Sequence, residues 1–370
     1  MAKSAAADTT KVLVTGASGY VATHCVQQLL QNGYRVRGTV RSLQNMTKIQ
    51  PLKALDKSDL LELVEADLEK PEDWPNAVKG CTYILHVASP FPIVPDASII
   101  KTAIEGTLNV LRAANKCETV RKVVLTSSCA AINEGHEECD KVFNEEDWSN
   151  LDNPIVNNYG RSKTLAEKAA WDFWKNIEDG NKFDLTVLNP VLVVGPALMD
   201  VEGASITVVK RFLNREMPAV PRLQLALVDV RDVAKAHLAL VDVRDVAKAH
   251  VLAMTEERSN GRRILITYTP SYWFMDIARV LAKEFGPQGY YVSTIRAPYA
   301  LVWLVSRIDK QAKSILPRIN HEVKFDNTVA KDILGLEFTS PDKSLIDMAY
   351  SMIERGILPK KPKYKPQNAE

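Results

Sequence analysis

Residues 11–22 of the chain read Lys-Val-Leu-Val-Thr-Gly-Ala-Ser-Gly-Tyr-Val-Ala. The run Lys11–Thr15 is a short, β-branched apolar segment typical of a buried strand, and Tyr20–Gln31 has the spacing of an amphipathic helix. Gly16 and Gly19 lie in the turn between them, where glycine permits a tight turn and lets backbone N–H groups approach a phosphate at the helix N-terminus. An ordinary strand-to-helix turn is the alternative, but the position of the glycine-rich turn directly after the first strand favours a dinucleotide-binding unit.

Apolar runs alternate with helical patterns through the first half of the chain. The pattern predicts helices over Ile99–Asn115 and Ile155–Glu178, and strands over Tyr34–Val40, Leu60–Glu65, Tyr83–Val87, Lys122–Thr126 and Leu185–Leu188. This alternation requires right-handed crossovers and a parallel sheet covered on both faces. We therefore expect an α/β fold, a Rossmann-like doubly wound parallel sheet with a smaller C-terminal substrate lobe.

The domain limits follow from the same pattern. We expect a disordered N-terminus over residues 1–10 and a nucleotide-binding domain over residues 11–190. Residues 191–358 should form mainly the substrate lobe, with segments that return to the sheet, and residues 359–370 a frayed Lys- and Pro-rich tail.

Composition excludes several classes of protein. The 370 residues carry 47 Lys and Arg against 45 Asp and Glu, which is no cationic surplus for nucleic-acid binding. No apolar stretch is long enough to span a bilayer, and the first ten residues lack the core of a signal peptide. Five scattered cysteines indicate no disulfide framework, and Cys129, His136 and Cys139 match no zinc-ligand spacing. We expect a cytoplasmic monomer or homodimer without metal, membrane or nucleic-acid partners.

The end of the second predicted strand indicates which dinucleotide binds. An NAD site places a carboxylate there for the ribose 2′-hydroxyl, whereas residues 35–42 of this chain read Arg-Val-Arg-Gly-Thr-Val-Arg-Ser. The guanidinium groups of Arg37 and Arg41 suit a 2′-phosphate, so we expect NADP(H), unless both arginines are solvated surface charges. Asp67, at the end of the third strand, is placed to accept a hydrogen bond from the adenine amino group or to cap the next helix.

A tyrosine and a lysine four residues apart open the long helix predicted over 155–178. This spacing places Tyr159 and Lys163 on one helix face, where the ammonium group would stabilise a phenolate and lower the pKa of the phenol. The fifth strand ends in Thr126-Ser127-Ser128, and the carboxyl ends of the strands are where an open α/β sheet builds its site. The Tyr159–Lys163 pair and the serines after the fifth strand together predict a site for acid–base chemistry.

These motifs, in this order, resemble the extended short-chain dehydrogenase/reductase superfamily, and more narrowly its dihydroflavonol 4-reductase-like NADPH-dependent carbonyl reductases. The similarity runs from Lys11 to Pro359. The segments that carry it are Thr15–Ala22, His86–Pro90, Thr126–Ser128, Tyr159–Glu167 and Leu188–Pro196.

The resemblance implies a Ser-Tyr-Lys triad. Tyr159 would protonate the carbonyl oxygen, Ser128 would hydrogen-bond it, and Lys163 would bind the nicotinamide ribose; Ser127 competes for the serine role. Asn133 falls at a substrate-facing position of the family, although a loop-capping role is an equal alternative. The implied cofactor contacts, besides Tyr159 and Lys163, are Gly16, Ser18, Gly19, Tyr20, Val21, Arg37, Arg41, Asp67, Leu68, Val87, Ala88, Ser89, Pro190 and Val193.

The expected function is NADPH-dependent reduction of an aldehyde or ketone on a hydrophobic small molecule. Within the superfamily, an epimerase or a hydroxysteroid dehydrogenase with the same triad is the alternative. A catalytically silent NADP(H)-binding sensor or interaction protein is the alternative from another class.

A perfect tandem duplication interrupts the second half of the chain. Leu225–His237 reads LALVDVRDVAKAH, and Leu238–His250 repeats it letter for letter. An odd shift of thirteen residues exchanges the two faces of a strand, so the copies cannot occupy equivalent places in one element. We expect the second copy to form the native strand and helix, because its helix continues directly into Val251–Met254. His237 and His250 are then products of the duplication rather than catalytic groups.

Overall fold

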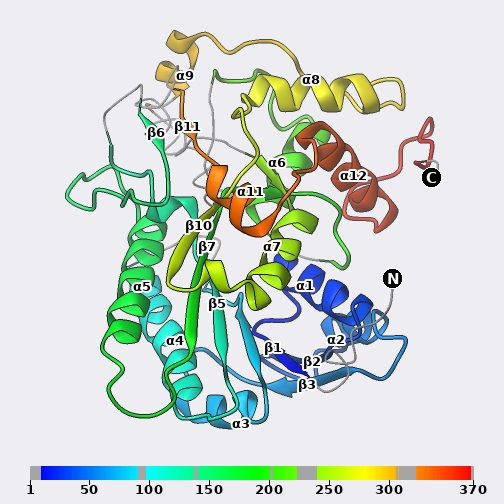
Figure 1. Cartoon of the computed structure of the whole chain (residues 1–370). Helices are drawn as coiled ribbons and strands as arrows, with labels where there is room; N and C mark the ends of the chain where they lie inside the picture. Colours follow the sequence, from blue (N-terminus) through cyan, green and yellow to red (C-terminus); the bar gives the residue numbers. More distant parts are fainter. Residues whose placement is uncertain are drawn as a thin grey trace.

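Seven parallel strands form the central sheet, in the order β10-β7-β5-β4-β1-β2-β3 (Figure 1). The computed structural model describes residues 10–90, 97–136, 141–200, 203–222, 240–305, 307 and 322–367. The strands are β1 (Lys11–Val14), β2 (Arg35–Val40), β3 (Leu61–Glu65), β4 (Tyr83–His86), β5 (Lys122–Thr126), β7 (Asp184–Pro190) and β10 (Arg262–Ile266). The strand order reverses between β1 and β4, and an open α/β sheet binds ligands at such a switch point. The predicted Rossmann-like fold is confirmed.

Helices cover both faces of this sheet. On one face α1 (Tyr20–Gln31) packs against α7 (Val243–Thr255), and on the other α4 (Ser98–Asn115) packs against α5 (Asn158–Lys175), as Figure 1 shows. Neighbouring residues of β1 alternate between the two cores: Val12 and Val14 belong to the core with α1, and Leu13 to the core with α4. Two short helices, α2 (Met46–Lys53) and α3 (Trp74–Val78), complete the crossovers.

Local capping explains where α5 differs from its predicted bounds. The prediction began the helix at Ile155, but the Asn157 side chain accepts a hydrogen bond from the Gly160 N–H at 2.9 Å and caps the helix there. The helix ends before Asn176, whose own N–H bonds back to the carbonyl oxygens of Asp172 and Phe173. The cap places Tyr159 in the first turn, at the carboxyl edge of the sheet.

The smaller lobe is built mainly from the C-terminal half. It contains two short strand pairs, β8 (Leu192–Val194) with β9 (Leu240–Asp242) and β6 (Val142–Phe143) with β11 (Lys324–Phe325). Its helices are α6 (Ala204–Leu213), α8 (Phe274–Phe285), α9 (Tyr299–Val305), α11 (Thr328–Leu334) and α12 (Pro341–Glu354). β10, which comes from the C-terminal half, returns to the main sheet beside β7.

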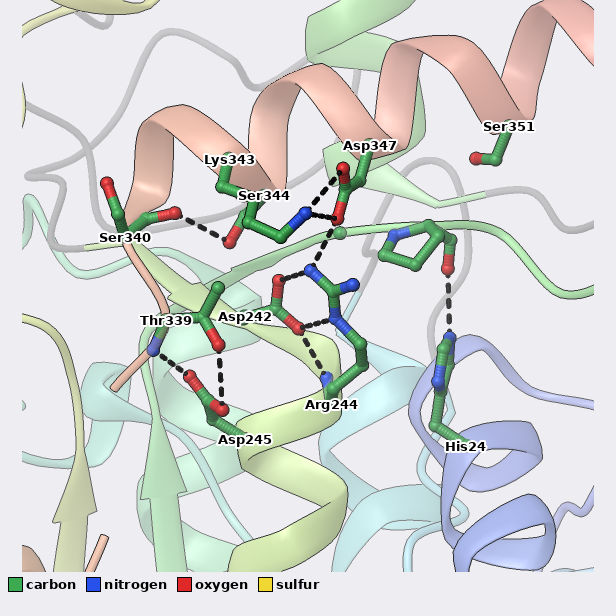
Figure 2. Close-up of polar contacts among 12 residues, drawn as sticks. His24, Asp242, Arg244, Asp245, Thr339, Ser340, Lys343, Ser344, Asp347 and Ser351 are labelled. Carbon is green, nitrogen blue, oxygen red and sulfur yellow. Dashed lines mark hydrogen bonds and ion pairs between the residues drawn. The ribbon is translucent and has the colours of Figure 1, made fainter. Parts of the chain in front are cut away.

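The second copy of the duplication forms β9 and α7, and the first copy lies outside the described residues. Asp242, the N-cap of α7, accepts from the Arg244 N–H and pairs with its guanidinium at 2.8 and 2.7 Å. Arg244 also reaches Asp347 of α12 at 2.8 Å, as Figure 2 shows. His250, fully buried, contacts Thr126 of β5 at 2.6 Å. These contacts hold α7 between the sheet and α12.

The C-terminal residues differ from the predicted frayed tail. Lys365 donates its backbone N–H to Gln288 at 3.1 Å, and Gln367 donates its side-chain amide to Asp347 at 3.0 Å. Residues 360–367 therefore pack on α12 and on the residues that follow α8, because their polar groups find acceptors there. Among the helices that the structure describes, none is both long enough and apolar enough to cross a membrane.

Candidate active site

The glycine-rich turn after β1 is wedged between β2 and β4. Gly16 has φ +63°, which favours glycine, and a Cβ there would lie 3.0 Å from the Ala88 Cβ. Thr39 of β2 accepts from the Gly16 N–H with its hydroxyl and from the Ala17 N–H with its carbonyl oxygen, both at 2.9 Å. The turn therefore has a fixed shape close to the switch point.

The first turn of α1 offers backbone donors to an anion. Its N-cap, Gly19, provides no side-chain hydrogen bond, and no acidic residue lies in the first turn. Such uncapped N–H groups, at the positive end of the helix dipole, suit a phosphate. Ser18 and Val21 flank the cap, while the Tyr20 hydroxyl donates to the Gly195 carbonyl oxygen at 2.6 Å. Tyr20 thus ties the turn to the segment that follows β8.

Arg37 does not lie at this site, which corrects its predicted role. Its side chain is buried, and Nε and Nη2 donate to the Glu62 carboxylate at 3.0 and 3.2 Å. Nη1 donates to the carbonyl oxygens of Asn76, Ala77 and Lys79. With its donors used in this way, Arg37 has no fork left for a phosphate. Arg41, exposed directly after β2, remains the arginine predicted to bind one.

Two further strand ends lie along the same edge. After β3, the Asp67 Oδ1 accepts from the Glu69 N–H at 3.0 Å, and the Leu68 carbonyl oxygen accepts from the Asn109 side chain at 2.9 Å. After β4, Val87, Ala88 and Ser89 are half-buried. The Ala88 N–H donates to the Thr15 hydroxyl at 2.9 Å, which links the end of β4 to the end of β1.

The two serines after β5 have different surroundings. The Ser127 hydroxyl donates to the Glu167 carboxylate at 2.5 Å, inside the protein. The Ser128 hydroxyl accepts from the Ala130 N–H at 3.2 Å and hydrogen-bonds Tyr159. Ser128 is therefore the serine that faces the phenol, and Ser127 belongs to the network behind it.

Tyr159 and Lys163 lie side by side on α5. The Lys163 ammonium lies 5.9 Å from the centroid of the Tyr159 ring, and both side chains are buried. Burial raises the pKa of Tyr159 above 10, against the hydrogen bond from Ser128, which lowers it. Burial lowers the pKa of Lys163 to about 8, although the Glu167 carboxylate raises it. At neutral pH the phenol keeps its proton and the lysine its charge.

The remaining predicted residues are buried. Pro190 ends β7 and Val193 lies in β8, both buried. Asn133 is 3% exposed, and its amide nitrogen and oxygen have no hydrogen-bond partner among the described residues. An unpaired buried amide is costly, which is typical of a group that awaits a ligand rather than of a loop cap.

The residues at the edge fit a nicotinamide dinucleotide. The glycine turn leaves no room for a side chain at Gly16, and the uncapped first turn of α1 suits the pyrophosphate. Lys163 is a buried residue whose ammonium lies 5.9 Å from the centroid of the Tyr159 ring. Ribose hydroxyls would supply the acceptors that such a group requires.

One protein-family model matches most of the chain. Residues 12–266 match the model described as the NAD dependent epimerase/dehydratase family. The chain belongs to this family. The predicted superfamily and the prediction of an NAD(P)-dependent oxidoreductase are confirmed at this level.

Individual relatives of this family member are reductases. The chain is 35% identical over 350 residues to cinnamoyl-CoA reductase 1 of Arabidopsis thaliana. The alignment covers 94% of this chain and 90% of that enzyme. It is 39% identical over 198 residues to a bifunctional dihydroflavonol 4-reductase/flavanone 4-reductase of Pyrus communis, across 51% of this chain and 55% of that enzyme. The crystal structure of yeast methylglyoxal/isovaleraldehyde reductase Gre2 with NADPH aligns at TM-score 0.74 and 27% identity, over 93% and 98% of the two chains.

Sequence reasoning missed the groups that hold the site together. Thr39 fixes the glycine turn, and Glu167 and Arg263 pair behind the serines at 2.5 Å. Glu167 had a local signal, since it lies four residues after Lys163 on the same helix face. Arg263 had none, because a strand arginine far along the chain does not reveal its acceptor.

Proposed function

We propose that the chain reduces an aldehyde or ketone on a hydrophobic small molecule with NADPH. The observation that carries this proposal is the Tyr159 phenol, hydrogen-bonded by Ser128 and flanked by the Lys163 ammonium at the carboxyl edge of the sheet. The reductase names of the relatives and the NADPH in the yeast Gre2 structure support it.

When bound, NADPH supplies the hydride for the carbonyl carbon. Tyr159 keeps its proton at neutral pH, because burial raises its pKa, and donates that proton to the carbonyl oxygen. Ser128 donates a hydrogen bond to the same oxygen as negative charge develops there. The Lys163 ammonium stabilises the phenolate that remains and binds the ribose hydroxyls.

The ends of different strands would bind different parts of the cofactor. The turn Gly16–Gly19 and the first turn of α1, with Tyr20 and Val21, would hold the pyrophosphate. Arg41 would bind the 2′-phosphate and Asp67 the adenine. Leu68, Val87, Ala88 and Ser89 would line the adenosine and ribose, and Pro190 and Val193 would flank the nicotinamide.

The cell context is part of the proposal. Cys25, Cys81, Cys117 and Cys129 are free thiols in the structure, which supports a reducing, cytoplasmic setting. We also infer a monomer or a homodimer and a small carbonyl compound as the binding partner. Residues 11–190, with β10, would bind the nucleotide, and the rest of residues 191–358 would form the substrate lobe.

The test is NADPH oxidation followed by absorbance, against aliphatic aldehydes, aromatic aldehydes and aryl ketones. Wild type should consume NADPH with at least one panel member, and Tyr159→Phe should lower kcat about a hundredfold or more, because the proton donor is lost. Turnover that survives Tyr159→Phe unchanged contradicts the mechanism. NADPH fluorescence that changes on binding without turnover on any compound favours the silent binder, and a product that retains its oxidation state favours an epimerase.

A further inference from the structure

Glu167 is a buried carboxylate four residues after Lys163 on α5. It is 1% exposed, and its Oε2 accepts from the Ser127 hydroxyl at 2.5 Å and from the Asn189 side chain at 2.8 Å. Its Oε1 accepts from the Arg263 Nε at 2.5 Å. An ionised carboxylate is tolerated inside a protein only when such donors replace its hydration. The donors and the carboxylate are therefore fixed as one unit.

Two of these donors, Ser127 and Asn189, are next to residues predicted to lie at the site. Ser127 precedes Ser128 at the end of β5, and Asn189 precedes Pro190 at the end of β7. The Asn189 amide also donates to the Ser128 carbonyl oxygen at 3.1 Å. One carboxylate thus sets the relative positions of β5, β7 and α5 where the carbonyl would react.

Arg263 extends this unit to the wall of the site. Its Nη1 donates to the carbonyl oxygens of Glu145 and Asp147 at 2.8 and 2.5 Å, and its Nη2 to the Ala131 carbonyl oxygen at 3.3 Å. The guanidinium also lies 3.7 Å from the centroid of the Trp148 ring. Asn133, the residue predicted to face the substrate, follows Ala131 by two residues, so the arginine anchors the backbone beside it.

The charge of Glu167 also acts on Lys163. The titratable groups that face the ammonium are Tyr159 and Glu167 on its own helix and His86 from β4, with Arg263 paired behind Glu167. Burial holds His86 neutral with a pKa of about 3, so Glu167 is the negative charge that offsets the desolvation of Lys163.

We propose that Glu167 and Arg263 are positioning residues of the reductase site. Glu167 aligns Ser128 and Pro190 through its hydrogen bonds to their neighbours Ser127 and Asn189, and it places a negative charge one helical turn after Lys163. Arg263 fixes Ala131, Glu145 and Asp147 to that arrangement. The proposal rests on the proposed function, and it assigns to the pair an effect on turnover beyond stability.

The first variant removes the charge and keeps the size of the side chain. Glu167→Gln should lower kcat for the carbonyl about tenfold or more, because misplaced reacting groups lose the benefit of orientation. The KM for NADPH should change less than kcat. Arg263→Lys keeps a charge but loses the planar fork, so it should raise the KM for the carbonyl more than it lowers kcat.

A readout without turnover follows the lysine itself. In the protein without cofactor, the ammonium of Lys163 is followed by NMR with isotope-labelled lysine and assigned by its loss in Lys163→Met. Its titration midpoint should move to lower pH in Glu167→Gln, because the offsetting negative charge is gone and Arg263 is left unpaired. An unchanged midpoint overturns the electrostatic part of the proposal.

Lys122→Met is the matched control for lost stability. Lys122 lies on β5 at the end opposite Ser128, is 4% exposed, and donates to Ser259 and to the Glu256 carbonyl oxygen at 2.8 and 2.9 Å. This variant should melt at a lower temperature and keep the kcat and KM of wild type. A Glu167→Gln enzyme that behaves in the same way, with a lower melting temperature and unchanged kcat, overturns the positioning role.

Ser127→Ala decides the question if Glu167→Gln does not fold. It removes one donor to Glu167, leaves the Arg263 pair intact and does not alter Ser128. We expect kcat to fall about three- to tenfold, and an unchanged kcat overturns the proposal. Failure of the proposed function is distinct, since wild type itself would then show no NADPH oxidation.

Discussion

The guanidinium of Arg37 is bound by the carboxylate of Glu62 on the neighbouring strand, through hydrogen bonds of 3.0 and 3.2 Å. Arg37→Met would remove this pair and leave three carbonyl acceptors around it without their donor. Because the Glu62 side chain is 47% exposed, we expect a loss of only about 1–3 kcal/mol in the free energy of unfolding, mainly from the unpaired carbonyl groups, measured by urea denaturation, with the KM for NADPH unchanged. A stable variant with a raised KM for NADPH would return Arg37 to the nucleotide site.

Substitution of Arg41 should have the opposite effect, weakening NADPH binding without lowering stability. Arg41 is exposed after β2, where its removal breaks no described contact, so Arg41→Ala should melt like wild type. Its KM for NADPH should rise about tenfold, the cost of one charge-assisted phosphate contact, and its KM for NADH should not change. Equal changes for the two dinucleotides would exclude a 2′-phosphate contact.

Reduction should depend on pH through Lys163. Its pKa is lowered to about 8, so the ammonium form predominates below that pH and is lost above it, while the raised pKa of Tyr159 keeps the phenol protonated throughout. Because this pKa is that of the free enzyme, we expect kcat/KM to be constant near pH 6–7 and to fall toward about tenfold per pH unit above pH 8. His86 and His250, with pKa values lowered to about 3 and about 4, stay neutral across this range. Lys163→Met should abolish the dependence; a fall that persists in it would assign the titration to another group.

Asn133 allows a test of ligand binding against stability. Its buried amide has no hydrogen-bond partner among the described residues, so Asn133→Leu should keep or raise the free energy of unfolding, by about 1 kcal/mol. The KM for the carbonyl should rise about tenfold, while the KM for NADPH stays the same. Destabilisation with an unchanged KM would instead show that Asn133 supports the loop.

The two copies of the duplication make a matched pair of variants. Arg244→Met removes the contacts to Asp242 and Asp347, and because Arg244 is 35% exposed we expect a loss of about 2 kcal/mol rather than that of a fully buried pair. Arg231→Met makes the same change in the first copy and should leave the melting temperature unaltered. The reverse result would place the first copy in β9 and α7.

The residues after the second copy explain why it should keep this place. If the first copy formed the helix, Leu240 would stand where Ala253 is buried and Val241 where Met254 is buried. A larger side chain at a close-packed alanine costs about 1–3 kcal/mol. Deletion of either copy leaves the same sequence, so point substitutions are the experiment that distinguishes the copies.

The sequence predicted the strands and helices that have a clear period. Tyr20–Gln31 is a helix with the predicted bounds, and β2, β3, β4 and β5 lie within one residue of their predicted ends. Asn157 moved the start of α5 because a single capping side chain overrides the apolar period. The residues at strand ends were also predictable, because parallel strands meet at one edge.

The directions of individual side chains were not predictable. The sequence alone does not distinguish the roles of Arg37 and Arg41. The strand register does, because it places Glu62 beside Arg37. Ser127 and Ser128 differ in the same way, since adjacent side chains diverge and one meets Glu167. The pairing of Glu167 with Arg263 joins distant segments that share no local pattern.

The extra copy also has a practical use. The chain carries additional residues between Arg222 and Leu240, while β8 and β9 remain paired and β10 remains in the sheet. A junction that accommodates such a length is suited to hosting a foreign domain. A fluorescent protein inserted there in place of the first copy would give a genetically encoded reporter, attached beside the proposed substrate lobe and distant in sequence from both chain ends.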